Sequence, residues 1–175
     1  MLKWLWISVV VIILDQVTKS IAASQLELFQ PLQLFTGFNF TLMHNKGAAF
    51  SLFSDHSGWQ RWFFSVIAIG VSIGIVIWMK RLPAKHKLTA ISLALILGGA
   101  IGNVLDRLLL GHVIDFIDIY YFASSCMIGF SSTGSECHWP AFNIADSAIS
   151  LGAVLLIFDS IRSARAEHKT SSEHS

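Results

Sequence analysis

Four stretches of the chain are apolar almost throughout, and polar connections separate them. They cover residues 4–23, 62–79, 88–105 and 144–161. Each is about 18 to 20 residues long, the length that an α-helix needs to cross a hydrocarbon layer of ~30 Å. The pattern therefore predicts four transmembrane helices.

The first stretch could also be a secretory signal, because a lysine precedes its apolar run and small residues follow. Asp15 and Lys19 lie between the apolar run and those small residues. Two charges at that place argue for a retained helix rather than a cleaved signal.

The long connections 24–61 and 106–143 carry patterns of their own. Residues 38–42 alternate between apolar and polar, which is typical of a half-exposed strand, so we expect a short sheet at the membrane surface. Residues 126–139 are rich in Ser and Gly and predict an exposed, mobile loop.

A chain of this length suits a single domain, residues 1–175. The predicted fold class is an all-α membrane protein with four transmembrane helices, a small extracytoplasmic β-sheet and a short helix or loop element on the same side. The polar tail 162–175 follows the last helix, and we expect residues 167–175 to be disordered.

Composition supports a membrane protein and limits its partners. Apolar residues make up 54% of the chain and charged residues 13%, whereas soluble domains carry about 25% charged residues. The net charge of +1 gives no sign of a nucleic-acid partner.

The positive residues are distributed unequally between the two sides of the predicted helices. Eight of the twelve fall at the two termini and in the connection between the second and third helices: Lys3, Lys80, Arg81, Lys85, Lys87, Arg162, Arg165 and Lys169. The opposite connections hold only Lys46, Arg61 and Arg107. Because positive residues collect on the cytoplasmic side, both termini are expected there and the long connections outside.

Polar side chains within the apolar stretches need partners, since a charge in a membrane helix costs from ~3 kcal/mol upward. Asp15 and Lys19 are four residues apart and could pair with each other. Asn103 and Arg107 have the same spacing and project from one face at the outer end of the third helix. Structural bonding between helices is the alternative explanation for each of these residues.

Two aspartates outside the spans suggest a reaction. Asp115 follows the outer end of the third helix, and Asp146 lies in the first turn of the fourth, where Asn143 would be the N-cap. Two carboxylates that share a site retain one proton between them, which supplies a base and an acid for aspartyl proteolysis. The helix dipole favours ionisation of Asp146, so we expect it to be the more readily ionised member.

Several alternatives remain open at this stage. Asp118, three residues after Asp115, could be its second partner in place of Asp146 if the segment is helical. A metal site would recruit a set of His and Asp residues, although they lack a tight motif: His112, Asp115, Asp118, His138 and Asp146. A small transporter would also place polar residues in helices, but these concentrate in the outer half. A non-enzymatic scaffold leaves the two acids unexplained, and a serine or cysteine nucleophile lacks a paired base.

Four blocks of residues resemble lipoprotein signal peptidase (signal peptidase II), in the same order on the four helices. They are DQVTK at 15–19, NKGAAFS at 45–51, GGAIGN at 98–103 continuing through DR at 106–107 to GHVIDF at 111–116, and FNIADS at 142–147. The resemblance covers nearly the whole chain.

This resemblance implies a membrane-embedded aspartyl endopeptidase without a cofactor or metal, which cleaves prolipoproteins before the diacylglyceryl-modified cysteine. It implies Asp115 and Asp146 as the catalytic pair. The residues implied to support them and to hold the substrate are Asp15, Lys19, Asn45, Gly47, Asn103, Arg107 and Asn143. The implied partners are the lipid-modified substrate and membrane lipid, and the implied state is a monomer in the bacterial inner membrane with its active site at the periplasmic face.

One segment departs from the family pattern. The connection 119–139 is longer than the family leads us to expect, and Cys126 and Cys137 fall within it. Facing an oxidising compartment, these two cysteines could form a single disulfide, which their spacing alone does not decide.

Overall fold

The structure is a computed structural model that describes residues 1–47, 59–127 and 129–172. Its described part contains four long helices: α1 (Leu5–Gln25), α2 (Trp59–Arg81), α3 (Lys87–Leu109) and α4 (Ile144–Ser172). A single 3₁₀ turn, η1 (Leu2–Trp4), precedes α1. All four helices are long and apolar enough to cross a membrane. The four predicted spans are therefore confirmed as helices. Each helix starts and ends within a few residues of the predicted apolar stretch, apart from α4, which continues well beyond it.

Helix α4 continues beyond the predicted span. It runs to Ser172, so the expectation of disorder is wrong for residues 167–172. Arg162, Ala164, Arg165 and Ala166 are good helix formers, which favours continuation of the helix past the apolar stretch. Residues 173–175 lie outside the described residues.

Helix α3 is the centre of the helical layer and packs against α1, α2 and α4. Glycines on α3 bring the neighbouring helices close. A Cβ at Gly99 would collide with the carbonyl oxygen of Ala145, and one at Gly102 would lie 2.7 Å from Oδ2 of Asp15. Small residues at these positions allow close helix packing in a membrane, and here they bring α1 and α4 against the same end of α3.

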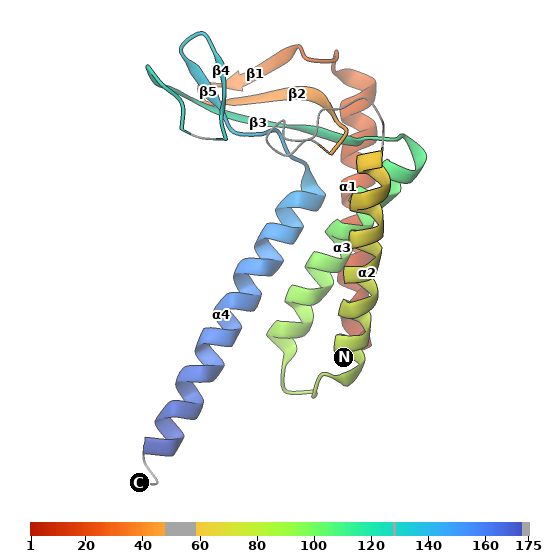
Figure 1. Cartoon of the computed structure of the whole chain (residues 1–175), viewed down its shortest axis with the longest axis vertical. Coiled ribbons are helices and arrows are strands. Elements are labelled where there is room, and N and C mark those ends of the chain that lie inside the picture. Colours follow the sequence, from red (N-terminus) through yellow and green to blue (C-terminus); the bar gives the residue numbers. More distant parts are fainter. Residues whose placement is uncertain (48–58, 128, 173–175) are drawn as a thin grey trace.

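A five-stranded antiparallel sheet lies at one end of the helices (Figure 1). Its strand order is β1-β2-β3-β5-β4, with bounds β1 (Pro31–Phe35), β2 (Phe38–Asn45), β3 (Val113–Phe122), β4 (Ser131–Thr133) and β5 (Glu136–His138). The expected strand at 38–42 is confirmed within β2. The expected all-α class is too narrow, because the sheet is a substantial layer.

Strand β3 lies in the connection after α3, where no strand was predicted from the sequence. Its ten residues are mostly β-branched and aromatic, which favours a strand over a helix. In residues 24–47 and in the described part of 106–143, the structure contains no short helix. Residues 48–58 lie outside the described residues.

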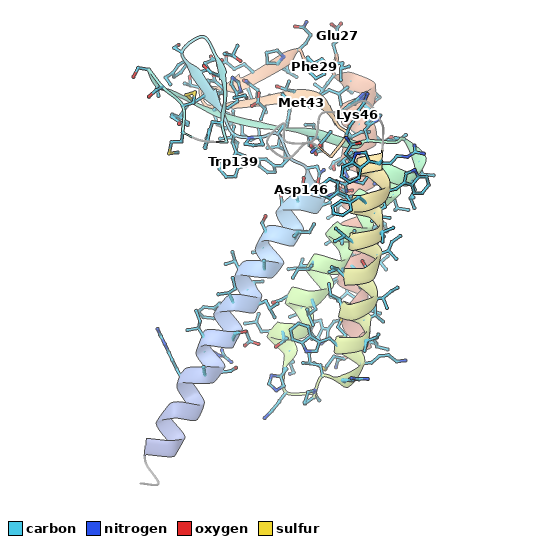
Figure 2. The ribbon with its side chains drawn as sticks, viewed as in Figure 1. Glu27, Phe29, Met43, Lys46, Trp139 and Asp146 are labelled. Atoms are coloured by element: carbon cyan, nitrogen blue, oxygen red, sulfur yellow. A yellow bond between two sulfur atoms is a disulfide. The ribbon has the colours of Figure 1, made fainter. Side chains whose placement is uncertain are left out.

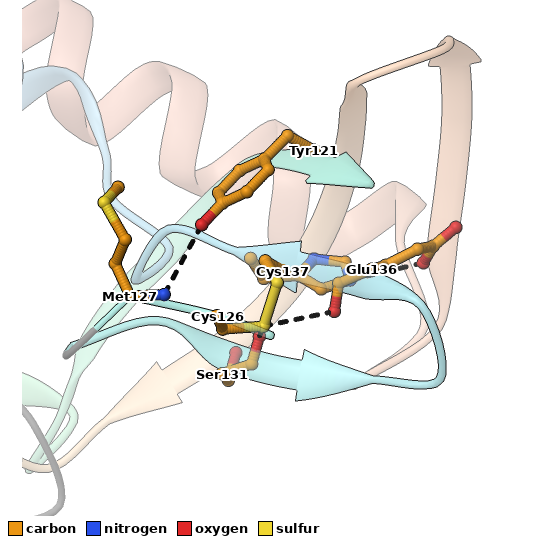
Figure 3. The surroundings of a disulfide bond; sticks show 7 residues. Tyr121, Cys126, Met127, Ser131, Glu136 and Cys137 are labelled. Atoms are coloured by element: carbon orange, nitrogen blue, oxygen red, sulfur yellow. Dashed lines mark hydrogen bonds and ion pairs between the residues drawn. A yellow bond between two sulfur atoms is a disulfide. The ribbon is translucent and has the colours of Figure 1, made fainter. Parts of the chain in front are cut away.

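The segment 126–139 is more ordered than its Ser and Gly content indicated. It contains the β4–β5 hairpin, and a disulfide joins Cys126 to Cys137 (Figure 3). Strand β5 pairs with β3, so the hairpin extends the sheet. The prediction of a loop is therefore wrong for residues 131–133 and 136–138, which form strands, whereas residues 131–135 are exposed as expected.

Both chain termini lie at the end of the helices opposite the sheet (Figure 1). The connection between α2 and α3 lies at that end too, and four of the positive residues fall in it or in the adjoining ends of the two helices. The arrangement thus separates a sheet-bearing end from an end rich in positive charge.

Candidate active site

Asp115 and Asp146 come together at the junction of the sheet and the helices. Asp115 is the third residue of β3, with only 2% of its surface exposed, and Asp146 is in the first turn of α4. Figure 2 shows Asp146 at the sheet end of α4. Expected on adjacent helix ends, the two aspartates instead come from a strand and a helix.

Asn143 connects the two carboxyl groups. Its side-chain amide donates to Oδ1 of Asp115 at 2.7 Å, and its backbone N–H donates to Oδ2 of Asp146 at 3.3 Å. The Asn143 side-chain oxygen in turn accepts the backbone N–H of Asp146 at 2.9 Å. This reciprocal pair caps α4, as predicted for Asn143, and holds the carboxylate of Asp146 beside the amide that binds Asp115.

Each carboxyl group receives a further amide from a different element. Asn45, at the end of β2, donates to Oδ2 of Asp115 at 3.0 Å. Asn103, on α3, donates to Oδ1 of Asp146 at 2.7 Å. All four carboxylate oxygens of the pair therefore accept a hydrogen bond. These bonds fix the orientation of both carboxyl groups and do not require both of them to be ionised.

Gly47 supports the position of Asn45. Its backbone N–H donates to the Asn45 side-chain oxygen at 2.9 Å, with φ at 101°. A Cβ at this position would lie 3.0 Å from the ring of Phe64. Glycine is therefore required here by the backbone conformation and by packing. The further expectation that small residues 47–49 admit a peptide concerns Ala48 and Ala49, which lie outside the described residues.

Lys19 is buried beneath the pair and uses its three N–H donors on three different partners. Its ammonium lies 2.8 Å from Oδ2 of Asp15 and 2.9 Å from Oδ2 of Asp106. It also donates to the side-chain oxygen of Asn103 at 2.9 Å. The predicted pairing with Asp15 is confirmed, and it is one part of a larger buried network that reaches the carboxyl group of Asp146 through Asn103.

The two acids beside Lys19 hold backbone groups of the site. Oδ1 of Asp15 accepts the N–H of Ala145 at 2.9 Å, and Oδ2 of Asp106 accepts the N–H of Ile114 at 3.1 Å. Each of these backbone groups belongs to the residue just before a member of the pair. One lysine with two aspartates therefore fixes both chain segments that carry the candidate catalytic side chains.

Asp106 and Gln16 were missed as site residues from the sequence. Gln16 donates to Oδ1 of Asp106 at 2.8 Å and to Oδ2 of Asp15 at 3.2 Å. Their position in the sequence was the signal that could have revealed them. Gln16 follows Asp15 and Asp106 precedes Arg107, and both Asp15 and Arg107 had been singled out as polar residues of apolar helices.

Arg107 lies at the edge of the site. One of its terminal nitrogens donates to the backbone oxygen of Asn103 at 3.3 Å, and the guanidinium lies 5.6 Å from the ring of Phe64. It interacts electrostatically with Asp146 and Asp115. Within the described part of the chain, its buried Nε has no hydrogen-bond partner, so it retains a donor for another group.

Asp115 has a strongly perturbed ionisation. The pKa of its carboxyl is raised from 3.8 to about 7, chiefly by burial and then by the charge of Asp146, against the lowering effect of the amides of Asn45 and Asn143. A carboxyl group with this pKa keeps a large protonated fraction near neutral pH. The expectation that Asp146 ionises more readily than Asp115 stays a prediction.

Asp118 lies outside the site. It is three residues from Asp115 on a strand, and side chains three apart on a strand project to opposite faces. Its carboxylate is occupied by Asn39 at 3.2 Å, Thr41 at 2.9 Å and His138 at 2.7 Å. The proposal that Asp118 could replace a partner of the pair depended on a helix here, and that premise is wrong.

The residues considered as metal ligands do not converge. Asp118 and His138 are bonded to each other on the face of the sheet opposite Asp115, and His112 stacks on His44 with ring centroids 3.9 Å apart. Across the described ranges, no three His, Cys, Asp or Glu side chains are grouped in a way that could hold a metal ion.

Comparisons with known proteins agree over most of the chain. The family described as signal peptidase (SPase) II matches residues 7–162. The lipoprotein signal peptidase of Teredinibacter turnerae is 50% identical over 160 residues, which cover 91% of this chain and 88% of the relative. That of Pseudomonas aeruginosa is 46% identical over 166 residues, covering 94% and 91% respectively. A solved bacterial membrane enzyme is similar with a TM-score of 0.75 and 30% identity, covering 93% of this chain and 89% of its own.

Proposed function

Because the chain belongs to the signal peptidase II family, we propose that Asp115 and Asp146 are the catalytic dyad with which it cleaves prolipoproteins. Members of this family are membrane-embedded aspartyl endopeptidases that remove signal peptides from prolipoproteins, and this chain is an enzyme of that type. The observation that carries the dyad assignment is the single side chain, Asn143, that binds one carboxyl group while its backbone binds the other.

The reaction uses one proton shared by the pair. The ionised carboxylate takes a proton from water as its oxygen attacks the scissile carbonyl carbon, and the protonated carboxyl donates its proton to the carbonyl oxygen. When the adduct collapses, the C–N bond breaks and the proton taken from water passes to the leaving nitrogen. In this proposal the leaving nitrogen belongs to the diacylglyceryl-modified cysteine.

The surrounding polar residues divide into two groups. Asn45, Asn103 and Asn143 orient the carboxyl groups, and the buried Lys19 with its two aspartates holds the backbone beneath them. Arg107 lies partly exposed at the edge of the site, and its guanidinium holds a backbone carbonyl of the substrate, which has no water to satisfy it in lipid. All of these contacts come from one polypeptide, so a monomer is sufficient for activity.

We propose that the sheet and the dyad lie at the periplasmic face and that both termini are cytoplasmic. The excess of Lys and Arg at the terminal end of the helices supports this orientation. The disulfide between Cys126 and Cys137 supports it independently, because disulfides persist in oxidising compartments such as the bacterial periplasm.

The experiment is cleavage of a diacylglyceryl-modified prolipoprotein by the purified protein in lipid, with the product identified by mass spectrometry. The unmodified precursor is the matched control for substrate. We expect wild type to release a fragment beginning with the modified cysteine, and Asp115→Asn and Asp146→Asn to release none above the uncatalysed background. A variant that folds and still cleaves at the wild-type rate would refute the role of that carboxyl group.

A further inference from the structure

The face of the sheet that carries Asp115 continues well beyond the site. Along β3, side chains two residues apart share a face, so Asp115, Ile117, Ile119 and Tyr121 project to the same side. The face then crosses to the hairpin, since Tyr121 pairs with Cys137 in β5. Trp139, two residues further, belongs to this side, and Figure 2 shows it beneath the sheet on the side of the helices.

This continuation is an apolar surface rich in aromatic rings, which we call the hairpin patch: the exposed Ile119, Tyr121, Met127 and Trp139, and the partly exposed Phe130. Tyr121, Phe130 and Trp139 form a chain of edge-to-face rings with centroids 5.4 Å and 5.2 Å apart. Exposure reaches 51% for Trp139 and 63% for Met127. Large apolar groups are seldom left this exposed together unless the surface contacts something.

The disulfide holds the patch together. It ties Cys126, just before Met127, to Cys137, just before the end of β5, and the backbone N–H of Met127 reaches the Tyr121 hydroxyl at 3.5 Å (Figure 3). The covalent link therefore keeps Met127 and Phe130 near Tyr121 and Trp139. A rigid apolar surface loses less entropy on contact with a partner than a mobile loop would.

Charge is nearly absent from this part of the chain. Residues 119–139 contain no Lys, Arg or Asp, and Glu136 and His138 are their only ionisable side chains apart from the disulfide-bonded cysteines and the tyrosines. His138 bonds to Asp118 on the opposite face, away from the patch. Ser131, Ser132 and Thr133 of β4 give the hairpin an exposed polar strand, so the segment is amphipathic.

The position of the patch points to its partner. Trp139 precedes the first residue of α4, Ile144, by five positions, and α4 is one of the helices that cross the membrane. Leu151 and Val154 further along α4 are exposed apolar side chains, so the chain passes within a few residues from the patch into a helix with an apolar surface. Trp and Tyr, with an apolar body and a polar tip, are enriched where hydrocarbon meets water.

We propose that the hairpin patch rests on the bilayer itself, with Trp139 and Tyr121 at the boundary between acyl chains and headgroups. The partner is membrane lipid rather than the acyl chains of the substrate or a second protein. This contact holds the sheet at a fixed height over the membrane beside the dyad, and it is independent of the assignment of Asp115 and Asp146.

The experiment measures the depth of Trp139 in the disulfide-bonded protein. Wild type and Trp139→Phe are reconstituted in vesicles of phosphatidylethanolamine and phosphatidylglycerol whose acyl chains carry bromine either near the headgroup or near the methyl end. The difference in emission between the two proteins isolates Trp139. We expect this emission to be quenched more strongly by the shallow bromine than by the deep one, and to be shielded from iodide in the water.

Two controls keep the result interpretable. Trp78→Phe provides a second difference signal, from an exposed tryptophan near the far end of α2, which should respond to bromolipid in every preparation. If Trp139→Phe does not fold, Trp139→Tyr replaces it, and the emission of Trp139 is again the difference between wild type and the variant. Emission from Trp139 that is quenched by iodide and unaffected by bromolipid would overturn the proposal. Quenching that appears only when a substrate with brominated acyl chains is added would overturn it in favour of a substrate contact.

Discussion

Asn143 performs two tasks with one side chain at the scale of single residues. It caps α4 through the backbone N–H of Asp146 and donates to Asp115 from the same amide group. The start of the helix and the geometry of the dyad are therefore coupled, and a substitution here changes both.

Asn143→Ala should reduce stability and activity together. Loss of the cap costs about 1 kcal/mol, and loss of a donor positioned on the dyad lowers kcat on the order of 10²-fold. Asn39→Ala is the matched control, since Asn39 donates to a buried aspartate on the opposite face of the sheet. It should lower Tm while kcat stays near wild type. Equal losses of kcat in both variants would contradict the specific role of Asn143.

The ionisation of Asp115 should be visible in the pH dependence of stability. Since its pKa rises from 3.8 to about 7 on folding, the folded protein binds more protons than the unfolded chain between these pH values. Its contribution to the free energy of unfolding is therefore greatest at low pH and is lost as pH rises through this interval. Asp115→Asn cannot ionise, so its Tm should gain on that of wild type as pH increases from 3.8 to about 7. A difference in Tm that is constant across this interval would contradict the raised pKa.

At the scale of elements, the network around Lys19 joins α1 and α3 to the start of β3 and the start of α4. Its acids bind the backbone just before each member of the dyad. The loss of one member of such a network is strongly destabilising, because an unpaired charge would remain in a buried site.

Lys19→Met leaves Asp15 and Asp106 without their shared cation and should destabilise the protein by about 3 to 5 kcal/mol. Adding Asp106→Asn should recover part of that loss, because it removes one of the unpaired charges. Lys3→Met, at an exposed position, should change stability by less than about 0.5 kcal/mol. Tm in detergent measures all three, and a harmless Lys19→Met would mean that the network contributes little.

Gly102 permits the close approach of α1 and α3 above this network. Gly102→Ala places a Cβ 2.7 Å from Oδ2 of Asp15, so it should displace that carboxylate from Lys19, lower Tm and reduce kcat. Gly70→Ala on α2 meets nothing within 4 Å, and helix propensity favours it by about 1 kcal/mol. The two variants should therefore move Tm in opposite directions, and a shared direction would contradict the packing argument.

At the scale of the whole molecule, hydropathy was sufficient to predict the helices but not the sheet. The apolar stretches match the four helices because a membrane requires long uninterrupted segments. Strand β3 was not recognised, since apolar residues occupy both of its faces and its two aspartates are spaced as on a helix. Its pairing with β2 and β5, which sequence spacing does not reveal, decides its conformation.

The sequence was sufficient to predict most residues of the site but not the contacts that join them. Topology alone placed Asp115 and Asp146 at the same end of the molecule, and the motifs suggested most of their neighbours. The role of Asp106 depends on a contact with Lys19 from another helix, 87 positions away in the chain (106 − 19). The cysteine pair was likewise undecided until the strand pairing of the hairpin brought the two residues together.

The most direct test of the account is the single-turnover cleavage rate of Asp115→Asn and Asp146→Asn, compared with Asp118→Asn, at saturating lipid-modified substrate. Asp118 lies on the same strand as Asp115 but on its opposite face, so the three variants remove the same chemical group from related places. The account predicts that both dyad variants lose at least about 10²- to 10⁴-fold in rate, as expected for a lost acid or base, while Asp118→Asn cleaves within a few-fold of wild type. Comparable losses in all three folded variants, or near-normal cleavage by either dyad variant, would contradict the assignment of Asp115 and Asp146 as the catalytic pair.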